Sequence, residues 1–195
     1  MKNGISDKYK RTHENLKKEA LRLFLEKGYD ASSVREITQK TNLSVGAFYR
    51  HFDSKEAVFV EIWDEYTGSS IERTIKEVEK IPSPQEAVSY LLEACEAFSN
   101  DEITNKLYVI FASLGDSNKL DKFPHINQSS KNYRRMLCQL VEQCCPDFSE
   151  EEKITAANAV HCLVNTYSMR NADSFQAFYF EKDAFRRCIF TLLHG

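Results

Sequence analysis

One short stretch, NLSVGAFYRHFDSKEA over residues 42–57, gathers side chains that could contact the phosphates of a nucleic acid. Its hydrogen-bond donors are Tyr49, Arg50, His51 and Lys55. Two phenylalanines, Phe48 and Phe52, are interleaved with them. A buried helix would exclude arginine and histidine, whereas a fully solvated helix would not keep so many aromatic rings. The stretch therefore predicts a helix that is anchored by aromatic side chains and offers donors to a polyanion.

The spacing of these residues separates two faces of the expected helix. At about 100° per residue, Phe48 and Phe52 point the same way, with Val45 beside them. Gly46 and Ala47 point the opposite way, as does Arg50. Small residues at these two positions would let the backbone approach the floor of a DNA groove closely.

Two short helices, expected over 33–40 and 44–51, would position this face. Asn42 falls in the turn between them, and asparagine tolerates a left-handed backbone better than most residues do. A short helix, a tight turn and a second short helix form the helix-turn-helix pattern, which presents its second helix to the DNA major groove. A chance look-alike within a helical bundle is the competing interpretation.

The charge of the chain favours the DNA interpretation. The net charge is −3, yet residues 1–60 hold 12 Lys and Arg against 8 Asp and Glu, a net charge of +4. The remaining residues hold 14 against 21, a net charge of −7. A basic N-terminal region on an acidic body suggests that this region meets a polyanion.

The apolar spacing predicts an all-α protein of about nine helices. Capping boxes, in which Glu follows Ser or Asp by three residues, are expected to start helices at Ser33, Asp53, Ser83, Ser99 and Ser149. Gly28 stands where a left-handed helix end belongs. The expected helices are 10–27, 33–40, 44–51, 54–79, 84–98, 101–114, 125–145, 150–171 and 174–193.

The segment GYDASSVREITQKTNLSVGAFYRHFDSKEAVF resembles the N-terminal DNA-binding region of TetR/AcrR-family transcriptional regulators, and the resemblance covers about residues 10–62. It implies that Arg35 reaches a phosphate or a base edge. It also implies that Val45, Gly46 and Ala47 face bases, and that Tyr49, His51 and Lys55 bind phosphates. The full expected DNA-binding set is Arg35, Ser44, Val45, Gly46, Ala47, Tyr49, Arg50, His51 and Lys55.

This chain departs from the family pattern at the turn, where Thr41-Asn42-Leu43 replaces a common Ala-Gly-apolar sequence. It also has apolar residues at Val45 and Ala47, where a donor or acceptor is common. Direct base readout would then lean on contacts with thymine methyl groups.

The resemblance implies three functional regions: a helix-turn-helix DNA-binding domain over 1–55 with its motif at 33–52, a connecting helix over 56–80, and a ligand-binding and dimerisation domain over 81–195. A homodimer through the last two helices would read a palindromic operator. Small residues and a wide apolar surface in these two helices agree with a dimer, although they also fit two helices buried within one subunit.

The expected function is that of a DNA-binding transcriptional regulator, with a repressor released by a small, apolar or amphipathic effector as its expected form. Candidate effector-binding residues are Tyr90, Phe98, Tyr108, Phe111, Tyr133, Met136, Asn165 and Met169. For each of them taken singly, ordinary core is the favoured interpretation.

The alternative is a thiol- or metal-responsive regulator with the same DNA-binding region, since the chain has six cysteines. Their spacing fits no standard zinc pattern, so we expect packing cysteines, no metal and no cofactor. The sequence also lacks common catalytic motifs, which argues against an enzyme. With no secretory signal and no membrane-spanning run in view, we expect a cytoplasmic protein with no membrane partner.

Overall fold

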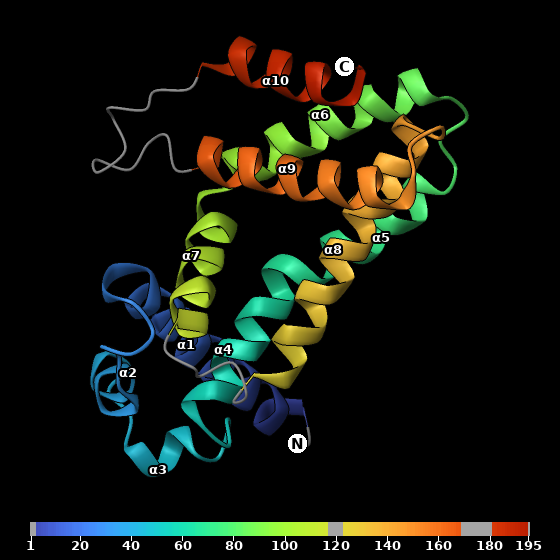
Figure 1. Ribbon diagram of the computed structural model, residues 1–195. Coiled ribbons are helices and arrows are strands. Elements are labelled where there is room, and N and C mark those ends of the chain that lie inside the picture. The colour runs from blue at the N-terminus through green and yellow to red at the C-terminus, as the bar shows by residue number, and fades with distance from the viewer. Residues whose placement is uncertain (1–2, 117–122, 169–180, 195) are drawn as a thin grey trace. The chain divides into compact units, whose positions relative to one another are not determined.

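The computed structural model is all-helical in the residues that it describes, which are 3–116, 123–168 and 181–194 (Figure 1). Its helices are α1 (Asn3–Lys27), α2 (Val34–Lys40), α3 (Val45–Phe48), α4 (Lys55–Trp63), the π-helical segment η1 (Asp64–Gly68), α5 (Ser69–Val78), α6 (Pro84–Asn100), α7 (Glu102–Asp116), α8 (Pro124–Cys144), α9 (Glu150–Ser168) and α10 (Lys182–His194). Because α4, η1 and α5 follow one another without a break, the described residues form nine helical segments. The all-α prediction is therefore confirmed.

Two expected boundaries were wrong in ways that bear on the site. Helix α1 begins at Asn3 rather than at residue 10, so its polar first turns are helical as well. Helix α3 ends at Phe48 rather than at residue 51, and Tyr49 caps its C-terminal end. Residues 49–51 continue as a turn in which the His51 backbone N–H donates to the Phe48 carbonyl oxygen at 2.8 Å.

Three of the five expected helix starts are confirmed. Ser33 forms a complete capping box with Glu36. Ser83 accepts a hydrogen bond from the Glu86 backbone N–H, and Pro84 occupies the first turn of α6. At the start of α9, the Ser149 backbone N–H donates to a Glu152 carboxylate oxygen, and the Glu152 backbone N–H donates to the Ser149 hydroxyl.

The starts expected at Asp53 and Ser99 were wrong, because a neighbouring side chain supplies the cap. The Ser54 hydroxyl accepts from the Ala57 backbone N–H at 3.1 Å and begins α4. An Asp101 carboxylate oxygen accepts from the Thr104 backbone N–H at 3.0 Å and begins α7. A second side-chain oxygen near a helix start can accept the same backbone N–H bonds as the expected capping residue. The sequence pattern alone does not decide which of the two residues caps the helix.

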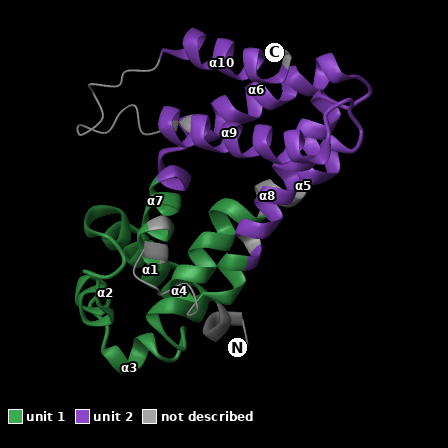
Figure 2. Cartoon of the chain, in the orientation of Figure 1, with its two compact units in different colours: residues 1–68, 106–127 green, residues 69–105, 128–195 purple. Residues whose placement is uncertain are grey.

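The chain divides into two compact units, residues 1–68 with 106–127 (unit 1) and residues 69–105 with 128–195 (unit 2), as Figure 2 shows. Unit 1 has an aromatic core around Phe59, whose ring centroid lies 5.5 Å from that of Phe24 and 5.6 Å from that of Phe123. Trp63, also fully buried, packs against Tyr108 at a centroid distance of 4.8 Å. Residues from both sequence segments of unit 1 thus share one core.

Unit 2 is built around α6, α8, α9 and α10, whose buried side chains form one cluster. The rings of Tyr167 and Phe185 stack at 4.3 Å between α9 and α10. An ion pair joins α10 to α6, because Lys182 lies 2.9 Å from the Glu96 carboxylate.

The limits of these units differ from the functional regions expected over 1–55, 56–80 and 81–195, which stay a prediction. Met169 and the expected helical residues 169–171 and 174–180 lie outside the described residues. No described helix combines the length and the apolarity that crossing a membrane requires.

Candidate nucleic-acid interface

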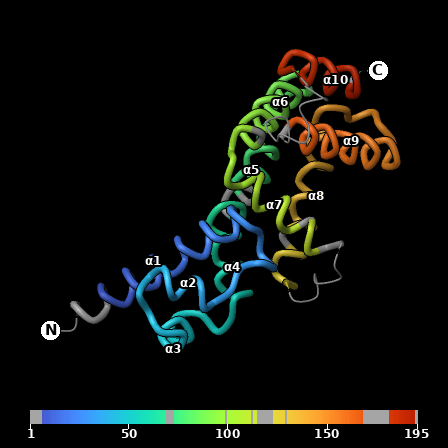
Figure 3. Tube along the Cα trace, turned by 90° about the vertical axis from the view of Figure 1, so that its left-hand side faces the viewer, coloured from blue at the N-terminus to red at the C-terminus, as the bar shows by residue number. Residues whose placement is uncertain are grey.

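Helix α2 packs against α1 and also contacts α3, which follows it in the chain (Figure 3). Ile37 on α2 and Phe48 on α3 are fully buried, and Phe52 is 4% exposed. Between the helices, Asn42 adopts a left-handed backbone with φ of 56°, as its place in the turn predicted. The Leu43 backbone N–H then donates to the Thr38 carbonyl oxygen at 2.9 Å, which closes the turn.

An exposed arc on α3 faces away from this core. Val45 and Tyr49, one turn apart, keep 42% and 53% of their surface exposed. Gly46 lies next to them, and a methyl group placed there would contact only the Ser44 hydroxyl, at 3.9 Å. Ser44 itself caps α3 by accepting from the Ala47 backbone N–H at 3.1 Å. We call Val45, Gly46 and Tyr49 the exposed arc of α3.

The structure corrects two assignments on this helix. Ala47 was expected to face DNA, but its side chain is only 5% exposed and packs into unit 1. Val45 was placed beside Phe48 and Phe52 by the helical spacing, yet it is exposed. The reason is that α3 is a single turn, so its buried side runs from Ala47 to Phe48 and leaves Val45 outside.

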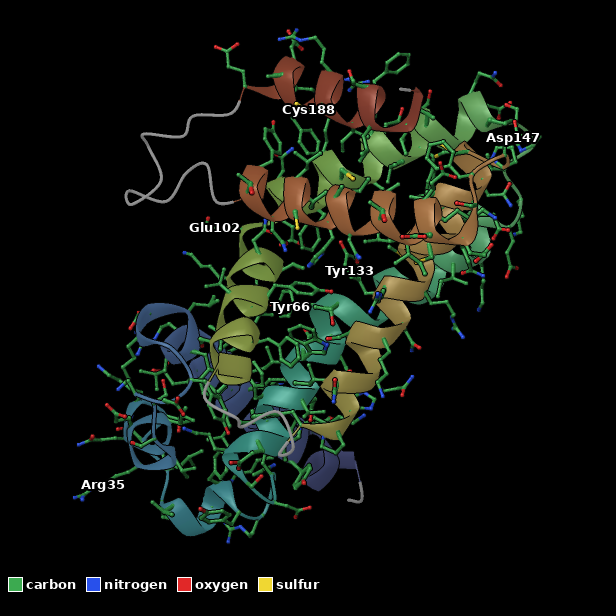
Figure 4. The ribbon with its side chains drawn as sticks, in the orientation of Figure 1. Arg35, Tyr66, Glu102, Tyr133, Asp147 and Cys188 are labelled. Atoms are coloured by element: carbon green, nitrogen blue, oxygen red, sulfur yellow. The ribbon has the colours of Figure 1, made fainter. Side chains whose placement is uncertain are left out.

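Exposed cations accompany the exposed arc. Arg35 projects from α2 away from the ribbon (Figure 4), and Lys40 and Arg50 are exposed too. None of these three forms an ion pair with another described residue. Several cations on α1, by contrast, are paired: Lys17 with Glu14, Glu61 and Glu65, Arg22 with Glu19 and Glu26, and Lys27 with Glu36. The cations on α2 and at the end of α3 therefore keep their charge available for an outside anion.

Lys55, expected to bind a phosphate, is committed to the protein itself. Its ammonium donates to the carbonyl oxygens of Tyr29 and Ser32, at 2.8 and 2.9 Å. It also lies 4.0 Å from the centroid of the Tyr29 ring, within the range of a cation–π interaction. Lys55 thus ties the start of α4 to the loop between α1 and α2.

We therefore expect Lys55→Met to act on stability. Losing a charged donor to two carbonyl oxygens should lower the free energy of unfolding by about 1.5–3 kcal/mol. Urea unfolding, followed by the fluorescence of Trp63, measures this change. The exposed Lys40→Met is the matched control and should stay within about 0.5 kcal/mol. If Lys55→Met left stability unchanged and reduced the salt dependence of DNA binding, Lys55 would be a phosphate ligand after all.

His51 is partly buried at the end of α3. Its ring centroid lies 4.2 Å from that of Tyr9 and 5.8 Å from that of His13, both on α1. Burial lowers the pKa of His51, and the neighbouring His13 and Arg50 lower it further. Because Nδ1 of His51 is buried without a hydrogen-bond partner, Nε2 is the ring nitrogen left for an outside acceptor.

Sequence reasoning missed Tyr9 and His13, since the expected first helix began at residue 10 and no role was given to either side chain. The Tyr9 hydroxyl donates to the Arg50 carbonyl oxygen at 3.1 Å. His13 stacks on Phe52 at a centroid distance of 4.3 Å. No local pattern could have found these contacts, because they join residues about forty positions apart.

Among the described residues, one group of metal-type ligands comes together: His13, Glu14 and Glu61. Lys17 donates to both carboxylates, at 2.9 and 3.3 Å, and His13 is hydrogen-bonded to Glu61. Because an ammonium group already lies among the carboxylates, we interpret the group as an ion-pair network and assign no metal to it.

The expected effector-binding residues separate into two places. In unit 1, Tyr108 and Phe111 pack on Trp63, at centroid distances of 4.8 and 5.1 Å. In unit 2, the Tyr133 ring lies 5.5 Å from that of His161, whose Nε2 is 3.0 Å from the amide nitrogen of Asn165. This small polar group adds His161, which was not among the expected effector-binding residues.

The other described residues that were expected to bind an effector also lie in unit 2. Met136 is 8% exposed within the core, and Phe98 packs against its edge. The Tyr90 hydroxyl donates to a Glu77 carboxylate oxygen at 2.8 Å. Met169 lies outside the described residues.

Three of the cysteines, Cys95, Cys144 and Cys145, are buried in unit 2. Burial raises the pKa of Cys95 and of Cys144 to about 12, and it raises the pKa of Cys145. Since the thiolate is the reactive form, these three thiols are suited to packing rather than to sensing. Cys162 and Cys188 are exposed.

Comparisons with known proteins agree with this arrangement. Residues 17–62 match the family model described as bacterial regulatory proteins, tetR family. The chain is 26% identical over 182 residues to the uncharacterized regulator YerO of Bacillus subtilis, covering 87% of this chain and 62% of YerO. It therefore spans less than two thirds of the length of that relative. It is 22% identical over 177 residues to IcaR of Staphylococcus epidermidis, a negative transcriptional regulator of the biofilm operon icaADBC, covering 90% and 93% of the two chains.

Among solved structures, the fold resembles that of the regulator FadR from Bacillus subtilis in complex with stearoyl-CoA. The TM-score is 0.62 at 16% identity, and the match covers 92% of this chain and 96% of FadR. The fold and the arrangement of α2 and α3 define a DNA-binding helix-turn-helix protein. More specifically, residues 17–62 match the DNA-binding region of the TetR family of transcriptional regulators. YerO and IcaR, which match most of this chain, are both named as transcriptional regulators.

Proposed function

We propose that this regulator is a repressor whose α3 enters the major groove of a palindromic operator and is withdrawn when a small effector binds. The observation that carries the proposal is the exposed arc of α3, together with Arg35, Lys40 and Arg50, which form no ion pair with another described residue. An apolar and a small residue in the arc suit close contact with bases, and the cations suit the phosphates on either side.

Within this proposal, the side chains divide by role. Val45 contacts base edges through thymine methyl groups, and Gly46 gives the backbone access to the groove floor. Arg35, Ser44, Tyr49, Arg50 and His51 contact phosphates or nearby base edges. Ala47 and Lys55 support the site from within the protein, since the former is buried and the latter binds carbonyl oxygens.

A homodimer through α9 and α10 would present two copies of α3 to one operator. Exposed apolar side chains support this interface: Ile154 on α9 and Phe190 on α10 are 43% and 52% exposed. Phe185, Ile189 and Leu193 face the core of unit 2, which leaves the other side of α10 for a partner. Dimers of helix-turn-helix proteins read half-sites about 34–36 Å apart, one DNA turn.

For the effector, we propose an apolar or amphipathic molecule. FadR, with a similar fold, binds stearoyl-CoA. Two separate candidate sites are available, one within each unit. The aromatic group of Trp63, Tyr108 and Phe111 in unit 1 suits an apolar molecule. The group of Tyr133, His161 and Asn165 in unit 2 suits a molecule with a polar group. IcaR, a negative regulator, supports repression as the mode of action.

Selection of bound sequences from a random DNA duplex pool tests the proposal and returns the operator. We expect a palindrome whose half-site centres are one helical turn apart. On that operator, Arg50→Ala should weaken binding and reduce the slope of log affinity against log salt by about 0.9 for each phosphate that is no longer neutralised. Arg134→Ala, an exposed arginine on α8, is the matched control and should leave the slope unchanged.

A pool with no enriched sequence would contradict the operator, and an enriched site without two-fold symmetry would contradict the dimer. The thiol-responsive alternative draws no support from the buried cysteines, whose raised pKa values keep them protonated.

A further inference from the structure

The first half of α1 holds the chain just after α3. The Tyr9 hydroxyl donates to the Arg50 carbonyl oxygen at 3.1 Å, and the Tyr9 ring lies against the His51 ring at 4.2 Å. One turn later, His13 stacks on Phe52 at 4.3 Å and approaches His51 at 5.8 Å. Every residue of the turn 50–52 is therefore in contact with α1.

His13 extends this contact to α4. Its Nε2 lies 2.8 and 3.0 Å from the two carboxylate oxygens of Glu61, and Lys17 donates to the same carboxylate at 3.3 Å. The Nδ1 atoms of His13 and His51 are both buried without a hydrogen-bond partner. The imidazole of His51 can thus reach an outside group through Nε2.

Burial and the charges around His51 both disfavour its protonation in the free protein. The groups that face it are Tyr9 and His13 from α1 and Arg50 from its own turn, and Glu61 of α4 is hydrogen-bonded to His13. Burial lowers the pKa of His51 first, followed by the effects of His13 and Arg50. A DNA phosphate at Nε2 acts in the opposite direction, since a nearby negative charge favours the imidazolium form.

We propose that Tyr9 and His13 are positioning residues for DNA binding, which hold His51 so that its Nε2 meets a phosphate and takes up a proton as the complex forms. This inference rests on the proposed docking of α3 on DNA. It adds a function for the first turns of α1 and a pH dependence to the complex.

The direction of the pH dependence of DNA affinity follows from the His51 pKa in the free protein and in the complex. In the free protein the His51 pKa lies below the usual 6.5, and in the complex it is higher. Between these two values the complex holds more protons than its separate components, so affinity falls as the pH rises. The slope approaches one decade of affinity per pH unit for each copy of unit 1 that docks. Below the pKa of the free protein the slope vanishes, because His51 is protonated in both states.

The test measures the affinity of the full chain for a short mixed-sequence DNA duplex at low salt, from below pH 6 to above pH 8, with the pKa of His51 followed by NMR with and without the duplex. We expect the His51 pKa to rise on binding. His51→Gln should remove this part of the pH slope. His13→Gln keeps a donor for Glu61 but removes a neighbour that lowers the His51 pKa, so the descending part of the profile should move to higher pH. Tyr9→Phe should weaken binding about two- to tenfold at every pH, the effect of one missing hydrogen bond.

His125→Gln is the matched control, because His125 is an exposed histidine of unit 1 that pairs with Asp64 instead. It should leave both affinity and slope unchanged. A His51 pKa that does not move with DNA, or a His51→Gln variant with the wild-type slope, overturns the inference while the proposed function stands. Absence of any duplex binding overturns the proposed function, and the inference with it.

Discussion

Phe48→Ala is expected to lower the free energy of unfolding of unit 1 by about 3–5 kcal/mol, the usual range for removing a fully buried phenylalanine. Phe48 is 0% exposed, and its ring packs 5.5 Å from that of Phe52. Since small domains are stable by only about 5–15 kcal/mol, this loss should leave unit 1 close to unfolding at ordinary temperatures. Urea unfolding is followed by tryptophan fluorescence, because Trp63 is the single tryptophan of the chain and lies in the core of unit 1.

The neighbouring ring provides the control. Tyr49 touches Phe48 edge-on at 5.4 Å but is 53% exposed. Tyr49→Ala should change stability by no more than about 0.5 kcal/mol and should weaken DNA binding. Equal losses of stability in the two variants would show that the aromatic residues of this segment are not divided between anchoring and docking.

Gly46→Leu is expected to abolish operator recognition without harming the fold. The backbone at Gly46 is not in the left-handed region, and an added Cβ atom meets only the Ser44 hydroxyl, at 3.9 Å. Stability should hold or rise slightly, because glycine is the less favourable residue within a helix. A leucine in the exposed arc would keep α3 from the groove floor. Affinity for the selected operator should fall to the non-specific level, about 10³-fold or more.

Two further variants serve as comparisons for Gly46→Leu. Gly46→Ala adds a single methyl group and should lose far less affinity than the leucine variant. Asn15→Leu places the same large side chain at an exposed position of α1 and should bind the operator as the wild type does. Wild-type affinity in Gly46→Leu would mean that α3 does not enter the groove.

Local signals in the sequence were enough to predict most of the fold. Capping residues such as Ser33 and Ser83 act within one turn, and the left-handed Asn42 and Gly28 satisfy backbone needs that only a few residue types meet. Errors arose where two local solutions compete. Asp53 and Ser54 both offer a capping oxygen, and only the packed structure decides between them.

The exposed residues of the candidate site were predictable from the sequence, but the contacts that hold the site in place were not. The placement of Tyr49 and Arg50 in solvent follows from the spacing of the phenylalanines around them. The role of Lys55 does not, because its acceptors at Tyr29 and Ser32 are more than twenty residues away in the chain. The contacts of Tyr9 with Arg50 and His51 likewise join residues about forty positions apart in the chain.

The core of unit 1 is assembled from two stretches of chain, and this matters for anyone who wishes to transplant its specificity. Phe123 and Tyr108 cover Phe59 and Trp63, although they lie far beyond the region that carries the family signature. A fragment cut shortly after Trp63 would expose these rings to water. A chimaera that borrows the operator preference of this regulator should therefore carry residues 106–127 along with the N-terminal 68, or supply equivalent rings from the recipient.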